Sequence, residues 1–127
     1  MEQKRRVRVV VGTVAAYATL NNTKVASAVW AALPLDFRVQ RWGDELYGSV
    51  SLDLAQEVPE EVVDRGALAW WPPGHAICLF FGPTPASVAD EPRAASDVTV
   101  FGSIEGDPAV FKSVSGSARM RIEQDRV

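Results

Sequence analysis

The sequence predicts a mainly β protein whose strands close into a small barrel, and three observations support this prediction. Several segments alternate apolar and polar residues with a period of two, as strands buried on one face do. Gly66–Trp71 and Ala76–Phe81 are apolar throughout and are joined by a short Pro-Pro-Gly-His turn. Only one long segment has a clear helical period. About eight strands with short turns favour a closed barrel, because closure removes exposed strand edges.

Length and composition fit one domain spanning residues 1–127. The chain is 47% hydrophobic and 23% charged, which is ordinary for a globular domain that buries a core without disulfides. Its net charge of −3 argues against nucleic acid as a partner, because nucleic acid selects a clustered basic surface. We interpret the basic residues near the start as the polar side of a first strand. They are Lys4, Arg5, Arg6 and Arg8.

The cysteine and hydropathy patterns predict a cytoplasmic protein. Cys78 is the single cysteine, so the chain forms no internal disulfide and a reducing compartment is expected. Cys78 itself is expected to be a small buried hydrophobe. No segment approaches the ~20 apolar residues of a membrane span. Arg8, Gly12 and Thr13 interrupt the apolar segment after the basic start, unlike the core of a signal peptide.

The first part of the chain predicts a hairpin and then a helix. Val7–Val11 and Val14–Leu20 are strand candidates separated by a tight turn. Positions 25, 28, 29, 32 and 33 are all apolar and fall on one helical face. A polar Asn-Asn-Thr sequence precedes them as a helix start, and Pro34 stops the helix. We therefore expect a helix over about residues 23–33.

The rest of the chain predicts further strands and one short helix. Segment 53–64 is acidic and contains Pro59, which is typical of a solvated loop. Residues 82–97 form a second, longer loop, whose length suggests a functional or mobile segment. The Asp-Pro pair at 107–108 starts a short helix over about residues 107–113. The remaining strand candidates are Phe37–Trp42, Glu45–Val50, Val98–Ile104 and Ser117–Glu123.

Two of the strands carry aromatic residues on both faces. Trp70 and Trp71 are adjacent, as are Phe80 and Phe81, and adjacent residues of a strand face opposite sides. One face would fill the barrel. The other would lie under helix 23–33, lie against another subunit in a homo-oligomer, or line a ligand groove, since large apolar patches mark binding surfaces. Helix 23–33 is the favoured cover for this outer face.

Trp42, Glu45 and Tyr47 form a second candidate cluster. Glu45 and Tyr47 are two residues apart and share a strand face. A carboxyl group flanked by aromatic rings loses water, which raises its pKa toward the range of a general acid. The favoured interpretation is structural: an ion pair between Glu45 and an arginine such as Arg41, or a hydrogen bond from a loop backbone.

No motif for a cofactor, a metal or a nucleophile is found. His75 is the single histidine and follows Pro-Pro-Gly, so we expect an exposed turn residue. One histidine and one cysteine do not make a transition-metal site, and no Gly-x-Ser-x-Gly sequence provides a hydrolase nucleophile. Gly102 and Gly106 match neither phosphate-binding glycine spacing. We therefore expect no cofactor and no metal.

Several short blocks, in order over nearly the whole chain, are together the signature of a known family. They are Leu20-Asn21, Leu33-Pro34, Trp42-Gly43-Asp44-Glu45-Leu46-Tyr47, Trp71-Pro72-Pro73-Gly74, Ile77-Cys78-Leu79-Phe80-Phe81-Gly82, Thr84-Pro85, Arg93-Ala94-Ala95-Ser96 and Val98-Thr99-Val100-Phe101-Gly102. With these blocks the chain resembles small, functionally uncharacterised prokaryotic proteins with a cyclophilin-like fold. The resemblance implies a closed eight-stranded barrel with two helices.

The chain is similar, more distantly, to the cyclophilin prolyl isomerases. Val100–Ile104 resembles their late strand, and Leu79-Phe80-Phe81 resembles their Gln-Phe-Phe strand. Leu79 stands where that family has its glutamine, and its tryptophan and histidine would fall near Arg93 and Val98. Arg38 and Arg41 lie on candidate strands, but neither matches the isomerase arginine. The resemblance therefore does not carry over the isomerase site.

Three functions remain open at this point. The favoured one is a module that binds a peptide or a small molecule in an aromatic groove. The alternatives are an atypical prolyl isomerase using Arg41 or Arg93, and a small-molecule enzyme using Glu45. The candidate ligand-binding residues are Trp42, Glu45, Tyr47, Trp71, Phe80, Thr84 and Arg93.

Overall fold

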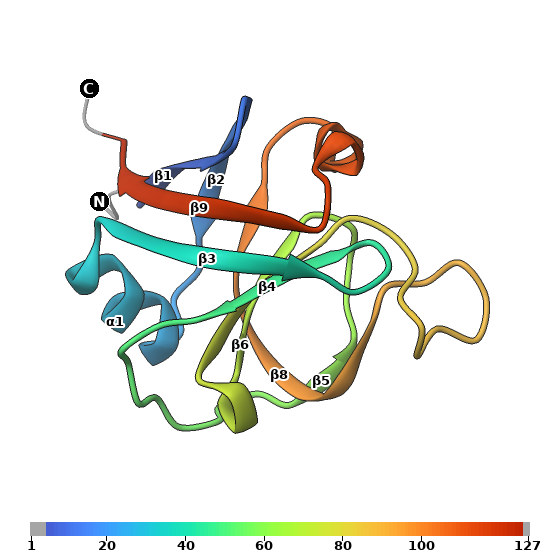
Figure 1. The fold of residues 1–127 in the computed structure, drawn as a ribbon. Coiled ribbons are helices and arrows are strands. Elements are labelled where there is room, and N and C mark those ends of the chain that lie inside the picture. Colours follow the sequence, from blue (N-terminus) through green and yellow to red (C-terminus); the bar gives the residue numbers. More distant parts are fainter. Residues whose placement is uncertain (1–4, 126–127) are drawn as a thin grey trace.

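The computed structural model describes residues 5–125 and is mainly β (Figure 1). Lys4, one of the basic residues noted above, lies outside this range. The strands are β1 (Arg6–Val11), β2 (Val14–Leu20), β3 (Leu35–Arg41), β4 (Glu45–Ser49), β5 (Glu60–Val62), β6 (Ala67–Trp71), β7 (Ala76–Phe80), β8 (Arg93–Ile104) and β9 (Ser117–Gln124). The helices are α1 (Lys24–Ala32) and the 3₁₀ helices η1 (Pro72–Gly74) and η2 (Pro108–Ser113).

Eight strands form a hydrogen-bonded ring. Their order is β2-β1-β9-β3-β4-β7-β6-β8, and pairing between β8 and β2 joins the two ends. Every neighbouring pair in the ring is antiparallel. β5 pairs with β8 alone and stands outside the ring. The predictions of a mainly β fold and of a ring of eight strands are therefore confirmed.

The interior of the ring is filled by alternate side chains of its strands. Val7, Val9 and Val11 of β1 are fully buried, whereas the residues between them are not. The same interior cluster contains aromatic residues from later strands, such as Trp70 and Phe101. Alternation along β1 thus separates an inner face from an outer one, as expected for strands with a period of two.

The two predicted helices are present, on opposite sides of the ring (Figure 1). Thr23 caps α1 by accepting a hydrogen bond at its hydroxyl from the backbone N–H of Ala26, at 3.0 Å, and Leu33 before Pro34 ends the helix. Asp107 likewise caps η2 through the N–H of Ala109, at 2.9 Å. The second helix is 3₁₀ rather than α, which is common in runs this short. No helix of residues 5–125 is long and apolar enough to cross a membrane.

Two sequence-based assignments are wrong in the region around β5 and β8. Segment 53–64, expected to be a loop, contains β5, and β8 begins at Arg93, five residues before the expected start. The two errors have one cause, because Glu60 pairs with Val98 and Val62 pairs with Arg93. All three β5 residues are exposed, so their side chains show no apolar alternation that would mark a strand.

Candidate functional site

A second group of buried apolar residues lies on the outer face of the ring. This outer cluster consists of Val63, Ala67, Ala69, Ala76, Cys78, Phe80, Ala94 and Val98. The prediction that helix 23–33 covers this face is wrong. The buried residues of α1, Val25, Ala26 and Val29, pack instead with the interior cluster, and the start of β8 contributes the cover of the outer face.

A pocket of about 290 Å³ opens beside the outer cluster. Its lining residues are Trp42, Glu45, Tyr47, Trp71, Cys78, Ala94, Ala95 and Val98. Three of these are large aromatic residues, and the others apart from Glu45 are small or aliphatic. Ligand sites are typically concave and apolar with few polar groups. The sequence-based interpretation of an aromatic groove near Trp42, Tyr47 and Trp71 matches this pocket.

The pairing of β4 with β7 places Glu45 in the pocket. Glu45 stands opposite Phe80, and Tyr47 stands opposite Cys78. Directly opposite residues of an antiparallel pair project to the same face, so all four side chains point outward. Leu46, between Glu45 and Tyr47, belongs to the interior cluster. The prediction that Glu45 and Tyr47 share a face is confirmed.

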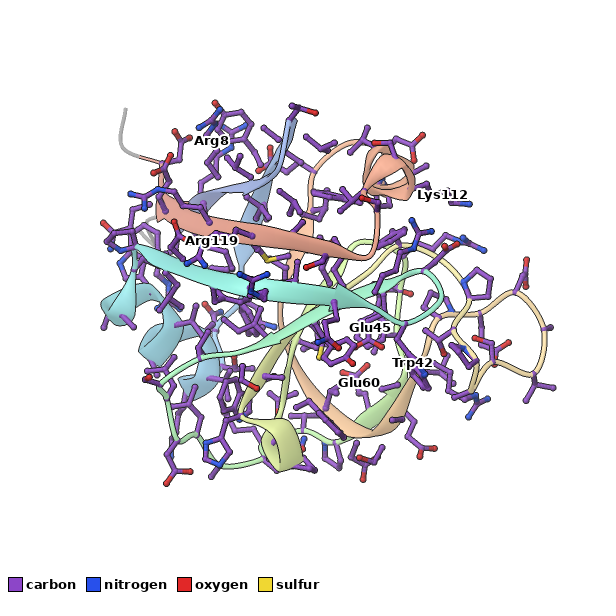
Figure 2. The ribbon with its side chains drawn as sticks, viewed as in Figure 1. Arg8, Trp42, Glu45, Glu60, Lys112 and Arg119 are labelled. Atoms are coloured by element: carbon purple, nitrogen blue, oxygen red, sulfur yellow. The ribbon has the colours of Figure 1, made fainter. Side chains whose placement is uncertain are left out.

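Trp42 reaches the pocket from the turn between β3 and β4. Its backbone N–H donates to the carbonyl of Glu45 at 2.9 Å. Gly43 follows with a positive φ of 61°, which glycine adopts without strain. A Cβ at this position would lie 2.9 Å from Pro85 Cδ and from Thr84 Cα. The turn therefore packs directly on loop 82–92, which connects β7 to β8. Figure 2 shows Trp42 and Glu45 on the same side of the ring.

Trp71 is held as a pocket wall by the turn that follows it. Its indole Nε1 donates to Ser96 Oγ at 2.7 Å. A Cβ on Gly74 would lie 2.7 Å from the Trp71 ring, so the missing side chain leaves room for the indole over η1. This packing explains why glycine follows the two prolines in the Trp-Pro-Pro-Gly block. His75 ends this turn as an exposed residue, as predicted, in the left-handed region with φ 46°.

Glu45 is a buried carboxyl group without an ion pair in the described structure. The residue is 5% exposed, and burial raises its pKa to about 7, a rise partly offset by a hydrogen bond from the Cys78 thiol. The pKa of that thiol is itself raised by burial and by the Glu45 charge. The favoured ion pair with Arg41 is absent, because Arg41 instead contacts Asp44 Oδ1 at 2.8 Å. Asp44 lies in the turn before β4, where it also contacts Lys112 at 3.7 Å, whereas Glu45 lines the pocket.

Three predicted site residues lie close to the pocket but do not line it. Phe80 is fully buried opposite Glu45. The Thr84 hydroxyl donates to the backbone carbonyl of Arg93. The Arg93 side chain contacts Glu91 at 3.0 Å and Glu61 at 3.8 Å. Thr84 and Arg93 therefore shape the loop that leads into β8.

Four lining residues were not predicted. Cys78 alternates with Phe80 along β7, so the strand period itself was a usable signal. Ala94, Ala95 and Val98 lie in the part of β8 that the sequence analysis assigned partly to a loop. Small residues in an apparent loop give no sequence signal for a ligand site. The pairing of β8 with β5 is what places these residues at the pocket.

The pocket lining contains few side chains that could ligate a metal ion. Among residues 5–125, no group of three or more His, Cys, Asp and Glu side chains is arranged to hold a metal. The lining contains one carboxyl group, that of Glu45, and one thiol, that of Cys78. Burial raises the pKa of the thiol, which therefore stays protonated. Metal sites need deprotonated ligands in larger number.

The comparisons with known proteins identify the fold family. The family model described as cyclophilin-like matches residues 5–123. The chain belongs to the cyclophilin-like family. A solved structure similar to this cyclophilin-like chain is the solution structure of the hypothetical protein AF2241 from Archaeoglobus fulgidus. The two are 32% identical with a TM-score of 0.81, over 96% of this chain and 95% of the other.

No curated protein matches the chain, and the archaeal protein is itself described as hypothetical. Family membership therefore establishes the fold and leaves the activity to be argued from the site.

Proposed function

We propose that this cyclophilin-like protein binds a small molecule, or a single apolar side chain of a peptide, in the pocket on the outer face of the ring. The observation that carries the proposal is the combination of aromatic walls with one buried carboxyl group, Glu45. Apolar walls supply affinity, and a single polar group orients the ligand. The volume of about 290 Å³ is at the small end of ligand pockets.

The interior of the ring offers no comparable place. We treat the ring as a closed barrel, and its inner face is packed with large buried side chains such as Trp70, Phe101 and Met120. Small barrels of about eight strands are commonly filled in this way. The packed interior therefore favours a binding site outside the ring, where β8 covers the outer face only in part.

A fragment titration followed by ¹⁵N NMR tests this proposal. The fragment set holds small alcohols, amides and amines together with alanyl-proline peptides. We expect the resonances of Trp42, Tyr47 and Trp71 to move, and Trp42→Ala to weaken binding at least tenfold through lost apolar contact, of order 1.4 kcal/mol or more. Tyr17→Ala is the matched control, because Tyr17 is an aromatic residue of β2 that does not line the pocket. Binding that is unchanged in Trp42→Ala, or a set without any ligand, contradicts the proposal.

One observation favours a second function, general acid–base catalysis by Glu45. A carboxyl group with a pKa of about 7 exchanges protons efficiently at neutral pH. Prolyl isomerisation lacks comparable support, because Arg41 and Arg93 are paired with carboxylates and are not among the lining residues.

The probe for this second function is proton abstraction from 5-nitrobenzisoxazole, whose ring opens when a base removes its carbon-bound proton. We expect a rate that rises with pH around pH 7 and that is lost in Glu45→Gln. The exposed Asp53→Asn variant is the control and should keep the rate, because Asp53 does not line the pocket. A rate that Glu45→Gln retains would contradict a catalytic role for Glu45.

A further inference from the structure

We propose that the ligand of this pocket is an organic cation, an alkylammonium group, with the Glu45 carboxylate as its counter-ion. The inference rests on the proposed binding function and names the chemical class of the ligand. Three independent features of the pocket support it: the missing partner of Glu45, the bonding of the aromatic walls, and the charge at the rim.

Glu45 has no cation to neutralise it within the described chain. The nearby basic side chains are engaged elsewhere: Arg41 and Lys112 contact Asp44 at 2.8 and 3.7 Å, and Arg93 contacts Glu91. A buried charge is costly unless it is paired. The protein thus leaves open the position of a positive group beside Glu45, and a bound cation would fill it.

Two of the three aromatic walls, Tyr47 and Trp71, present rings rather than free hydrogen-bond donors. Tyr47 Oη donates to Gln40 Oε1 at 3.1 Å, and Trp71 Nε1 donates to Ser96 Oγ. Because these polar atoms already have partners, Tyr47 and Trp71 offer the pocket mainly carbon and π surface. Rings of this kind attract alkylated ammonium groups through cation–π contacts, best of all when the ring is tryptophan. Trp42 adds a second tryptophan to the lining.

The rim adds a further negative charge. Glu60 of β5 stands opposite Val98, a lining residue, across the β5–β8 pair. Opposite residues project to one face of a sheet, so the exposed Glu60 side chain stands on the face that carries the pocket. Figure 2 draws Glu60 in the same region as Glu45 and Trp42. Carboxylates at a pocket mouth attract cations and repel anions.

Binding of a cation is coupled to the release of a proton from Glu45. When Glu45 is neutral, the entering ammonium favours ionisation, and the carboxyl proton leaves to solvent. Burial puts the pKa of free Glu45 at about 7, so affinity should rise with pH up to that value. The other titratable or charged groups on the surrounding elements are Cys78 on β7, Tyr47 on β4, Glu60 and Glu61 on β5, Arg93 and Asp97 on β8, Arg38 and Arg41 on β3, and Asp44 in the turn before β4. The pKa of the Cys78 thiol is raised by burial, so it stays protonated in this range.

Choline and its uncharged isostere 3,3-dimethylbutan-1-ol are the probes, titrated into the whole protein and followed by tryptophan fluorescence and calorimetry. We expect choline to bind at least tenfold more tightly at about pH 8.5 than at about pH 5.5, because the ionised fraction falls about tenfold per pH unit below the pKa. The isostere should bind with little pH dependence. Calorimetry at about pH 5.5 in buffers of different ionisation enthalpy should detect release of close to one proton per choline.

Glu45→Gln should remove the preference for choline and leave binding of the isostere in place, which separates loss of charge from loss of folding. Tyr17→Ala is again the control, since its ring contacts Arg6 outside the pocket. Equal binding of the two probes, or tighter binding at low pH, would overturn the cation class and leave the pocket function standing. If choline does not bind at any pH, the cation class is wrong, whereas the fragment titration decides the pocket function separately.

Discussion

Trp70 and Trp71 are neighbours on β6, yet they belong to different parts of the molecule. Trp70 is fully buried inside the ring, where its Nε1 donates to the Leu54 carbonyl at 2.9 Å. Trp71 is half-buried on the outer face and donates to a side chain, Ser96 Oγ. The inner face is filled by side chains of the ring strands together with those of α1 and η2, whereas the outer face depends on the partial cover of β8. The pocket and the buried carboxyl group of the proposed function are both on the incompletely covered side.

The largest expected effect is on stability and comes from the inner face. Trp70→Ala should reduce the free energy of unfolding by about 3–5 kcal/mol, the usual loss when a buried aromatic side chain is truncated. Trp71→Ala should cost less than half as much, because part of its ring is already in contact with solvent, but it should remove a pocket wall. Urea unfolding monitored by far-UV circular dichroism measures both. Equal losses for the two variants would contradict the distinction between the two faces.

The second prediction concerns the carboxyl group of the outer face. The pKa of Glu45 is raised by burial from 4.5 to about 7, so the folded state binds the proton more tightly than the unfolded one. Its contribution to stability is complete below pH 4.5 and is lost as the pH rises through about 7. The loss amounts to roughly 3 kcal/mol at 1.36 kcal/mol per pKa unit.

Unfolding of the protein and of Glu45→Gln at a series of pH values measures this loss as a difference between the two curves. The free energy of unfolding of Glu45→Gln should not show this loss, so the variant should become more stable relative to the unsubstituted protein as the pH rises. Glu60→Gln serves as the control, because Glu60 is exposed. A difference between protein and Glu45→Gln that does not change with pH would show that Glu45 is not desolvated.

Strand alternation and helix signals in the sequence predicted much of the difference between the inner and outer faces. The adjacent tryptophans required two buried faces, and the spacing of Glu45 and Tyr47 put both on one of them. The caps at Thr23 and Asp107 gave the helix starts correctly. These features are local, so a single stretch of sequence contains the whole physical cause.

The cover of the outer face could not be predicted, because it depends on contacts between distant segments. β5 has three exposed residues and becomes a strand only by pairing with β8. The place of α1 was also missed, since its apolar stripe fits either face and only the fold decides between them. The pocket depends on these same long-range contacts, so Ala94, Ala95 and Val98 escaped the sequence analysis.

A third prediction concerns Arg41, which connects η2 to the turn at the edge of the pocket. Arg41 donates to the carbonyls of Lys112 and Val114 at 2.9 and 2.8 Å, and to Gly43 in the turn that carries Trp42. It thereby links the end of η2 to the edge of the pocket. Arg41→Met should cost about 2 kcal/mol, because hydrogen bonds from a charged donor to carbonyls are among the stronger ones.

Arg119→Met is the matched control for Arg41→Met. Arg119 lies on the adjacent strand β9 (Figure 2). It contacts Asp36 at 2.8 Å, but its side chain is 60% exposed. Exposed ion pairs contribute about 0–1 kcal/mol. Thermal unfolding of the two variants compares them directly, and equal changes in Tm would show that the carbonyl contacts of Arg41 contribute nothing special.

The smallest expected effect returns to the two tryptophans. Ser96→Ala removes the acceptor of the Trp71 indole and should cost about 1 kcal/mol, the typical net value of one hydrogen bond. The corresponding acceptor of Trp70 is a backbone carbonyl, which no side-chain substitution removes. The indole N–H resonance of Trp71 should therefore shift and exchange faster with solvent in Ser96→Ala, while that of Trp70 stays unchanged. Ser96→Thr keeps a hydroxyl and should leave both resonances in place. If Ser96→Ala disturbs Trp70 as well, the two faces of β6 are coupled, and the outer pocket cannot be altered independently of the interior.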